Sequence, residues 1–165
     1  MPEQAVIMGV DAALYATGVG IIRAHEDEIR IVHTDLIRTS DKDDLPRRLE
    51  QIFNSISELI RAYKPDILAL EDIFYSKNLK IAMSLGQARG IIMLACAKYG
   101  IRLVEYSARE IKQAITGNGA ASKEQVAYMV KSLLNIETAF KTHDISDSLA
   151  AAICAGFKMK SLAAR

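Results

Sequence analysis

Gly9-Val10-Asp11 and, after a turn, Thr17-Gly18-Val19-Gly20 belong to the first two strands that the sequence predicts. Residues 6–10 form a short apolar run that ends at the aspartate, and residues 18–23 form the second strand. Residues 28–34 alternate between two faces and predict a third strand. Because short turns join these strands, we expect an antiparallel meander at the start of the chain.

Strands and helices alternate after the meander. Apolar residues at helical spacing predict a helix over residues 44–64, and Pro65 follows it as a stop signal. Similar patterns and helix caps predict two further strands, at residues 66–70 and 101–106, and four helices, at residues 79–99, 107–116, 122–134 and 144–158. This order predicts one α/β domain over residues 1–165, with a five-stranded mixed sheet flanked by helices.

The composition is that of an ordinary globular domain. Half of the 165 residues are hydrophobic, which suffices for one substantial core. No run of about 18 uninterrupted apolar residues indicates a membrane span, and residues 1–4 lack the basic flank of a signal peptide. Cys96 and Cys154 lie in Ala-rich stretches without metal-ligand spacing, which predicts small core residues. We therefore expect a cytoplasmic protein without structural zinc or disulfides.

Charge is distributed unevenly although the net charge is only +1. Residues 24–72 contain seven Lys or Arg against twelve Asp or Glu, whereas residues 77–131 contain nine against three. A basic half suits a polyanion such as a nucleic acid, but solvated helix faces produce the same pattern. Charge alone leaves both interpretations open.

Four carboxylates stand where an α/β fold places its functional site. Asp11 and Glu71 each follow an apolar strand, and the ends of central strands are common positions for active sites. Asp144 and Asp147 are three residues apart at the start of the last predicted helix, so both project from one side of its first turn. Carboxylate oxygens suit Mg²⁺ or Mn²⁺, and two such ions can drive phosphodiester hydrolysis.

Each acid also has an ordinary structural interpretation. Asp144 could cap the last helix, and Asp147 could favour the positive end of the helix dipole. Asp11 could be a turn residue, and Glu71 could simply be solvated. Spacing alone does not decide between these roles and a metal site.

Motifs along nearly the whole chain resemble those of the RuvC family of Holliday junction resolvases. The matching segments follow in family order: residues 9–11 and 17–20 quoted above, then Ala69-Leu70-Glu71-Asp72-Ile73-Phe74, Lys77-Asn78, Leu85-Gly86-Gln87-Ala88-Arg89-Gly90, Glu105-Tyr106-Ser107-Ala108-Arg109, Lys112-Gln113, Gly117-Asn118-Gly119-Ala120 and Asp144-Ile145-Ser146-Asp147-Ser148-Leu149-Ala150. Chance similarity in this order and spacing is improbable.

The resemblance implies a ribonuclease-H-like fold and a homodimer that makes paired, Mg²⁺-dependent nicks in four-way junction DNA during recombination and repair. It implies catalytic and metal-binding roles for Asp11, Glu71, Asp144 and Asp147, with two Mg²⁺ ions per site and Mn²⁺ as a substitute. A branch-migration helicase complex is the implied working partner. Some relatives carry His where this chain has Asp144, which makes the neighbouring His143 an accessory candidate: either a general base or a bystander on a loop.

The resemblance also implies residues that hold DNA. Phe74 would stack on a base exposed at the junction centre, although a core aromatic under a loop is a rival interpretation. Lys112 and Lys123 match lysines that contact phosphates, and Lys123 stands in the first turn of a predicted helix. Lys77 and Asn78 are expected on the same surface, unless they are simply solvated.

Ala12-Ala13 is the clearest departure from the family pattern, which has Pro-Gly after the first aspartate. A glycine there would permit a tight turn near metal and phosphate that a Cβ could hinder. An alternative function is therefore a junction-binding protein with impaired catalysis. A third hypothesis, an actin-like nucleotide-binding domain, needs a second similar domain for which 165 residues leave no room.

The predicted helix over residues 79–99 is apolar nearly all round. One face must cover the sheet, and the other could pair with its twin across a two-fold axis. Burial of the whole helix inside one domain is the competing interpretation, and the sequence does not separate the two.

Overall fold

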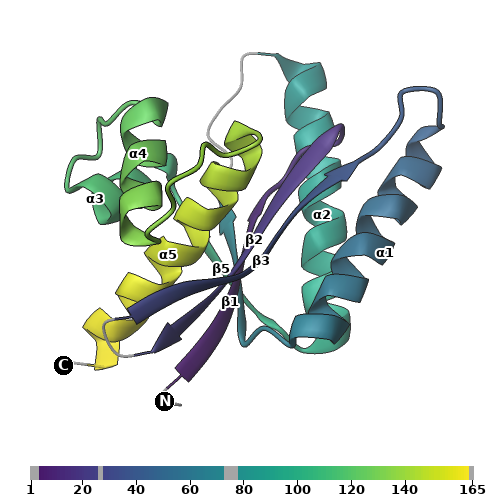
Figure 1. Cartoon of the computed structure of the whole chain (residues 1–165). Helices are drawn as coiled ribbons and strands as arrows, with labels where there is room; N and C mark the ends of the chain where they lie inside the picture. The colour runs from purple at the N-terminus through teal and green to yellow at the C-terminus, as the bar shows by residue number, and fades with distance from the viewer. Residues whose placement is uncertain (1–3, 26–27, 73–77, 164–165) are drawn as a thin grey trace.

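The structure, a computed structural model, describes residues 4–25, 28–72 and 78–163 (Figure 1). Within them the elements follow the order βββαβαβααα. The strands are β1 (Gln4–Asp11), β2 (Ala16–His25), β3 (Glu28–Arg38), β4 (Ile67–Glu71) and β5 (Arg102–Tyr106). The helices are α1 (Leu45–Tyr63), α2 (Leu79–Tyr99), α3 (Ala108–Thr116), α4 (Lys123–Leu133) and α5 (His143–Ala163).

The strands form one mixed sheet in the order β3-β2-β1-β4-β5. β1, β2 and β3 pair antiparallel, whereas β4 pairs parallel with β1 and with β5. The predicted meander and mixed sheet are confirmed. β2 and β3 run longer than predicted, because their backbone pairing continues beyond the predicted stretches, from Ala16–Arg38 to His25–Glu28, across a register shift at Ile21 and Ile22.

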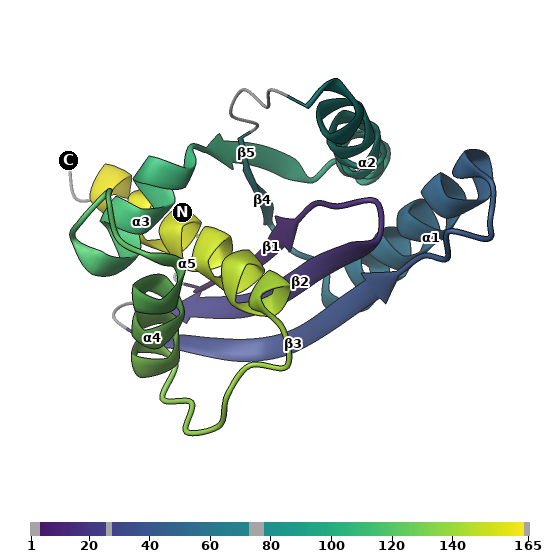
Figure 2. The same ribbon diagram turned by 90° about the horizontal axis from the view of Figure 1, so that it is seen from above.

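Both faces of the sheet are covered by helices (Figure 2). Met8, Val10 and Leu70 pack on one face with residues of α1 and α2. Ile7 and Ala69, which alternate with them along the strands, pack on the other face with residues of α3, α4 and α5. A strand covered on both faces is apolar throughout, which explains the continuous apolar runs of β1 and β4.

Side-chain caps define the starts of four helices. Asp44 caps α1, and capping boxes open α3 at Ser107 and α4 at Ser122. Oδ1 of Asn78 accepts hydrogen bonds from the backbone N–H groups of the first turn of α2. Each cap satisfies N–H groups that lack a partner inside the helix, and the predicted starts of these helices are confirmed.

Two glycines let α5 approach the sheet very closely. A Cβ on Gly9 of β1 would lie 1.9 Å from the carbonyl oxygen of Ser148. A Cβ on Gly18 of β2 would lie 2.2 Å from the carbonyl oxygen of Asp144. Since real Cβ atoms do not approach backbone this closely, any other residue at either position would push α5 away from the sheet.

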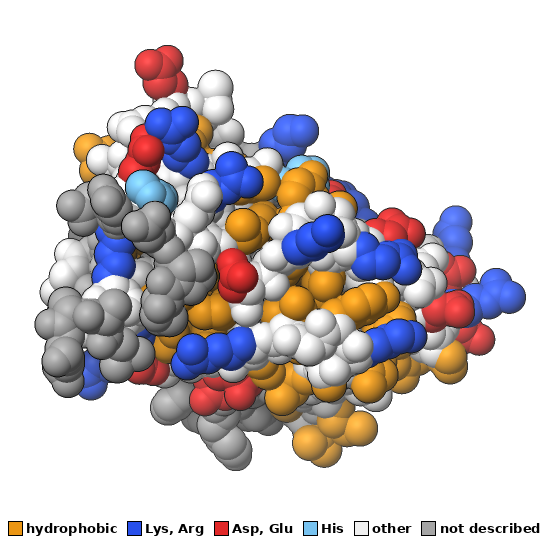
Figure 3. Space-filling model, turned by 90° about the horizontal axis from the view of Figure 1, so that it is seen from below, with side chains coloured by type: hydrophobic (Ala, Val, Ile, Leu, Met, Phe, Trp, Pro, Cys, Tyr) orange, Lys and Arg blue, Asp and Glu red, His pale blue; other side chains and the backbone are white. Residues whose placement is uncertain are grey.

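α2 keeps an apolar face exposed. Leu79, Met83 and Leu94, which share this face at helical spacing, are all more than half exposed. By length and composition α2 could cross a membrane, but the same test is passed by helices of soluble proteins, and 28% of its most apolar window is buried against the rest of the molecule. Seen from below, apolar side chains lie among Lys and Arg on the side of α1 and α2 (Figure 3). The interpretation that α2 is wholly buried is wrong.

Candidate active site

Asp11 and Glu71 end neighbouring strands at the same edge of the sheet. β1 and β4 run parallel, and their paired residues stop one position before both acids. Side chains alternate between the faces of a strand. Ile7 on β1 and Ala69 on β4 face α5, and each acid follows by an even number of residues. The register therefore places both carboxylates on the α5 side.

α5 brings Asp144 and Asp147 to the same edge. It packs on β1 and β2, and the backbone of Asp144 lies against Gly18, the cross-strand partner of Asp11. Asp147 stands one helical turn further along α5, is 21% exposed, and lines a pocket together with Glu71. The four acids predicted from the sequence thus come together from three elements.

α5 begins one residue earlier than predicted. Because its first residue is His143, Asp144 lies inside the first turn and not at the cap position. The interpretation of Asp144 as the helix cap is therefore wrong, although its charge still suits the positive end of the helix dipole. His143 is exposed, and its role as an accessory base stays a prediction.

Burial and like charges act together on Asp11. Burial in the first place, and then the charges of Asp147, Asp144 and Glu71, raise the pKa of Asp11 to about 7. The positive charge of Lys123 opposes this rise. A carboxyl group whose pKa is raised by burial and by neighbouring acids is frequent at functional sites.

The same surroundings raise the pKa of Glu71, through partial desolvation first and Asp147 second. Lys123, Lys112 and Arg89 lower it. Nζ of Lys123 lies 3.5 Å from Oδ2 of Asp147. Both lysines line a pocket of about 140 Å³ with Glu71 and Asp147. The two lysines predicted to contact phosphates therefore stand beside the carboxylates.

The donors at this edge fit a hard divalent cation. All four are carboxylates, the ligands that Mg²⁺ and Mn²⁺ prefer, and their mutual repulsion adds to burial in raising the pKa of Asp11. In the described part of the chain, no three His, Cys, Asp or Glu side chains are close enough to form a ready-made metal cluster. A cation would have to draw the carboxylates together, and it would offset their repulsion as it did so.

The loop after Asp11 accommodates its two alanines without strain. Among the described non-glycine residues, only Lys64 and Asn135 have positive φ, so Ala12 and Ala13 have no need of glycine. The Thr17 hydroxyl donates to the carbonyl oxygen of Ala13 at 2.6 Å, and Ala12 is buried in the core. Nothing in this geometry favours the hypothesis of impaired catalysis.

Of the other three residues predicted to bind DNA, only Asn78 is among the described residues. Phe74 and Lys77 lie outside the described residues. Asn78 is exposed and its Oδ1 caps α2, so it has a structural role that the sequence interpretation did not include. Its contact with DNA stays a prediction.

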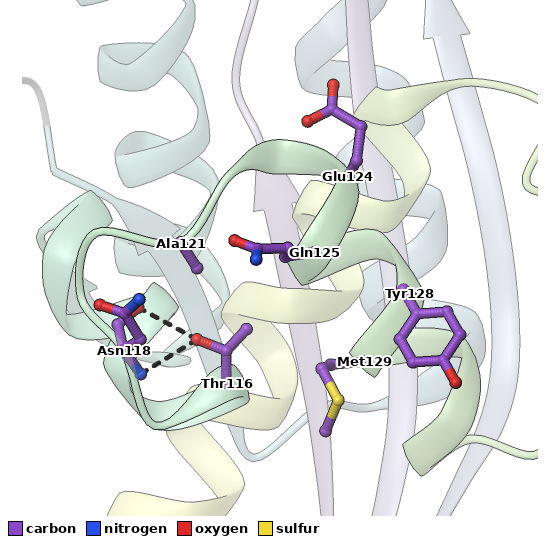
Figure 4. Close-up of a pocket in the computed structure, with 7 residues that line it drawn as sticks. All are labelled: Thr116, Asn118, Ala121, Glu124, Gln125, Tyr128 and Met129. Carbon is purple, nitrogen blue, oxygen red and sulfur yellow. Dashed lines mark hydrogen bonds between the residues drawn. The ribbon is translucent and has the colours of Figure 1, made fainter.

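A larger pocket, of about 530 Å³, lies between the α3–α4 loop and α4 (Figure 4). Its lining includes Tyr128 and Met129, and the Thr116 hydroxyl is hydrogen-bonded to the backbone of Asn118. Glu124 points away from the Thr116–Asn118 pair. None of the four clustered acids lines this pocket, so the larger hollow and the candidate active site are different places.

Two residues that organise the site were not identified from the sequence. Gly18 allows Asp144 to approach β2, and Arg89 is a buried arginine that contacts the backbone of Glu71. Both occur in the motifs that carry the family resemblance. The detectable signals are a glycine inside a strand, which marks a close approach, and an arginine in the middle of a mostly apolar helix.

The sequence comparisons identify relatives over nearly the whole chain. Residues 7–155 match the family model described as crossover junction endodeoxyribonuclease RuvC. The protein of that name from Chloroherpeton thalassium is 44% identical over 159 residues, which cover 96% of this chain and 86% of the relative.

Solved structures agree with the fold. The RuvC of T. thermophilus in complex with a Holliday junction substrate superposes with a TM-score of 0.91 at 26% identity, over 95% of this chain and 96% of that one. A yeast mitochondrial Holliday junction resolvase, with a TM-score of 0.65 at 14% identity over 93% and 80% of the two chains, shares the fold alone. The predicted ribonuclease-H-like fold is confirmed.

Proposed function

Because this chain belongs to the RuvC family of crossover junction endodeoxyribonucleases, we propose that Asp11, Glu71, Asp144 and Asp147 are its catalytic, metal-binding residues. The chain is a nuclease that resolves Holliday junctions in recombination and repair. The observation that supports the residue assignment is the convergence of four carboxylates from β1, β4 and α5, with the pKa of Asp11 raised by burial and by the other three acids.

Mg²⁺ is the proposed cofactor, at two ions per site with Mn²⁺ as a substitute. Bound there, it would activate water and stabilise the leaving oxygen of a phosphodiester. Asp11 and Glu71 supply oxygens from rigid strand ends, while Asp144 and Asp147 supply them from one helical turn. Placement on regular elements fixes the backbone from which each carboxylate extends, so that only the side chains need to move to bind a metal ion.

Lys123 and Lys112 are proposed to hold the scissile strand. Lys123 is 69% exposed at its side chain and opens α4, so its ammonium group, which pairs with Asp147, is also accessible to a phosphate. Lys112 is half-buried at the rim of the same pocket. Phe74, Lys77 and Asn78 are proposed to contact the junction from the segment between β4 and α2.

Lys123→Gln should weaken junction binding about equally for all junction sequences. It should also reduce the slope of log Kd against the logarithm of the salt concentration by about one, which corresponds to one counterion. A phosphate contact carries no sequence information, which is why the loss should be uniform. Junction affinity measured from 50 to 200 mM salt tests this expectation. Lys131→Gln, a lysine in the last turn of the same helix, is the control, and an unchanged salt slope in Lys123→Gln would contradict the assignment.

The exposed face of α2 is proposed as the surface of a homodimer. Leu79, Met83 and Met93 stand at helical spacing with Gly86 and Gly90 between them, where a Cβ would meet open space. Small residues in the centre of such a stripe allow two helices to approach closely. A two-fold axis through this face would relate two active sites and so provide for two cuts.

Leu94→Asp should weaken this dimer at least about 100-fold, because a charge enters an apolar interface without a partner. Sedimentation should give twice the 18.2 kDa monomer mass for the parent protein and the monomer mass for the variant at micromolar concentration. Tyr128→Asp, an exposed aromatic on α4, is the matched control. A Leu94→Asp protein that sediments like the parent would contradict the assignment of this face.

A branch-migration helicase complex is the proposed partner in the cell, and the cytoplasm is the proposed location. The function itself is tested by incubating the purified protein with synthetic four-way junctions of varied sequence, in the presence of Mg²⁺ or Mn²⁺. Paired symmetrical nicks support it. Junction binding without any cut, across metals and sequences, would instead favour the alternative of a binding protein.

A further inference from the structure

Arg89 is a buried arginine in the middle of α2. Its side chain is 7% exposed, although arginine is almost never fully buried unless it is paired. It stands on the side of α2 that faces the sheet, while Gly86 and Gly90 on the same helix are exposed. The sheet-facing side of α2 is otherwise apolar, so the guanidinium needs specific partners.

The contacts of Arg89 link α2 to β4 and β5 at the active-site edge. Nη1 donates a hydrogen bond to the backbone carbonyl of Glu71, the last residue of β4. Nη2 donates to Oε1 of Glu105 on β5, and Oδ1 of Asp72 lies 3.9 Å from Nη2. One side chain of α2 thus holds β4 and β5 together at the point where β4 ends.

The Glu71 carbonyl is where this support matters for catalysis. β4 pairs with β1 only as far as Leu70, so the following carbonyl lies beyond the ladder with β1 and needs another partner. On the other side, the N–H of Asp72 donates to the carbonyl of Tyr106 at 2.8 Å. The peptide group between Glu71 and Asp72 is therefore held at both its oxygen and its nitrogen. Because side-chain rotamers depend on backbone angles, a fixed peptide restricts the direction of the Glu71 carboxylate.

We propose that Arg89 is a positioning residue for Glu71: by holding its carbonyl, it presets the carboxylate for the metal ion. This role presumes the metal site proposed above. It differs from a purely structural ion pair with Glu105, because it acts through the backbone of Glu71 and predicts an effect on metal binding.

Arg89→Met removes the hydrogen bonds and the charge but keeps much of the side-chain volume. We expect about a 10- to 100-fold loss in Mn²⁺ affinity, the range typical when the support of a metal ligand is removed, and a similar loss in the maximal rate of junction cutting. Mn²⁺ binding to the DNA-free protein is measured by calorimetry, and metal-free junction affinity by fluorescence anisotropy. Junction affinity should change less than about twofold, since the Arg89 side chain is 7% exposed and has little surface with which to contact DNA.

Arg89→Lys should lie between the parent protein and Arg89→Met, because lysine supplies a charge and donors but not the two-pronged fork. It also keeps the test decisive if Arg89→Met fails to fold, as thermal unfolding would show. Arg102→Met, at an exposed arginine that pairs with the opposite end of β4, is the control and should behave like the parent.

Glu105→Gln distinguishes the positioning of Glu71 from a purely structural ion pair between Arg89 and Glu105. The amide oxygen still accepts a hydrogen bond from Arg89, so Mn²⁺ affinity should fall less than about threefold. If Glu105→Gln loses as much Mn²⁺ affinity as the Arg89 variants, the ion pair alone matters and the positioning role is overturned. Parent-like Mn²⁺ affinity in folded Arg89→Lys and Arg89→Met would overturn it as well. Failure of the parent protein itself to bind Mn²⁺ would instead refute the metal site.

Discussion

Asp11→Asn should cut a synthetic four-way junction at least about a thousandfold more slowly than the parent protein. The substitution keeps the size of the side chain and removes the charge that binds metal. A metal ion contributes several kcal/mol to the transition state of phosphodiester hydrolysis, and about 4 kcal/mol corresponds to a thousandfold in rate. Single-turnover cutting with saturating protein and Mg²⁺ measures the chemical step directly.

Junction binding is the control for this loss. Without metal and at pH 8, where Asp11 is mostly ionised, Asp11→Asn should bind the junction at least as tightly as the parent, because it removes a negative charge from the edge proposed to contact DNA. Asp41→Asn, the same change at an exposed residue of the β3–α1 turn, should cut at the parent rate. A folded Asp11→Asn protein that cuts within tenfold of the parent would remove Asp11 from the catalytic site.

The metal-free protein should become less stable as the pH rises from about 4 to about 7. Asp11 has a folded-state pKa of about 7 against an ordinary value of 3.8. In this window the folded protein retains a proton that the unfolded chain has released, so raising the pH favours unfolding. The free energy of unfolding should fall by up to about 1.4 kcal/mol per pH unit, and Glu71 contributes in the same direction.

Urea unfolding in chelator at pH 5 and pH 8 measures this change. Other groups also titrate over this range, so the decisive quantity is the difference between the parent and Asp11→Asn. The variant should be the more stable protein at pH 8 by about 2 kcal/mol or more, and Mn²⁺ should stabilise the parent but not the variant. Equal pH dependence in both proteins would show that Asp11 is not held in an unfavourable ionised state.

The positions of Asp11 and Glu71 could be predicted because they follow from local patterns. Each acid ends a continuous apolar strand, and parallel pairing brings such strand ends to one edge. Helix starts were equally accessible, since Ser107 and Ser122 are followed by the acceptors that complete their capping boxes. Sequence periodicity and caps therefore account for most of the sheet and for half of the acids.

The approach of α5 to the sheet could not be predicted, because it depends on contacts between residues far apart in the chain. The distance between Asp144 and β2 is set by the missing side chain of Gly18, and the orientation of Glu71 is tied to Arg89 on another helix. Neither relation leaves a periodic pattern in the sequence. The lengths of β2 and β3 were underestimated for a related reason, since the pairing that extends them joins residues of two different strands.

Anomalous diffraction from crystals soaked in Mn²⁺ tests the metal site most directly. We predict Mn²⁺ peaks within about 2 to 2.5 Å of carboxylate oxygens of Asp11, Glu71, Asp144 and Asp147, and their loss in Asp11→Asn crystals. Crystals of active protein in which Mn²⁺ is absent from these four side chains, and binds only elsewhere on the chain, would contradict this metal site.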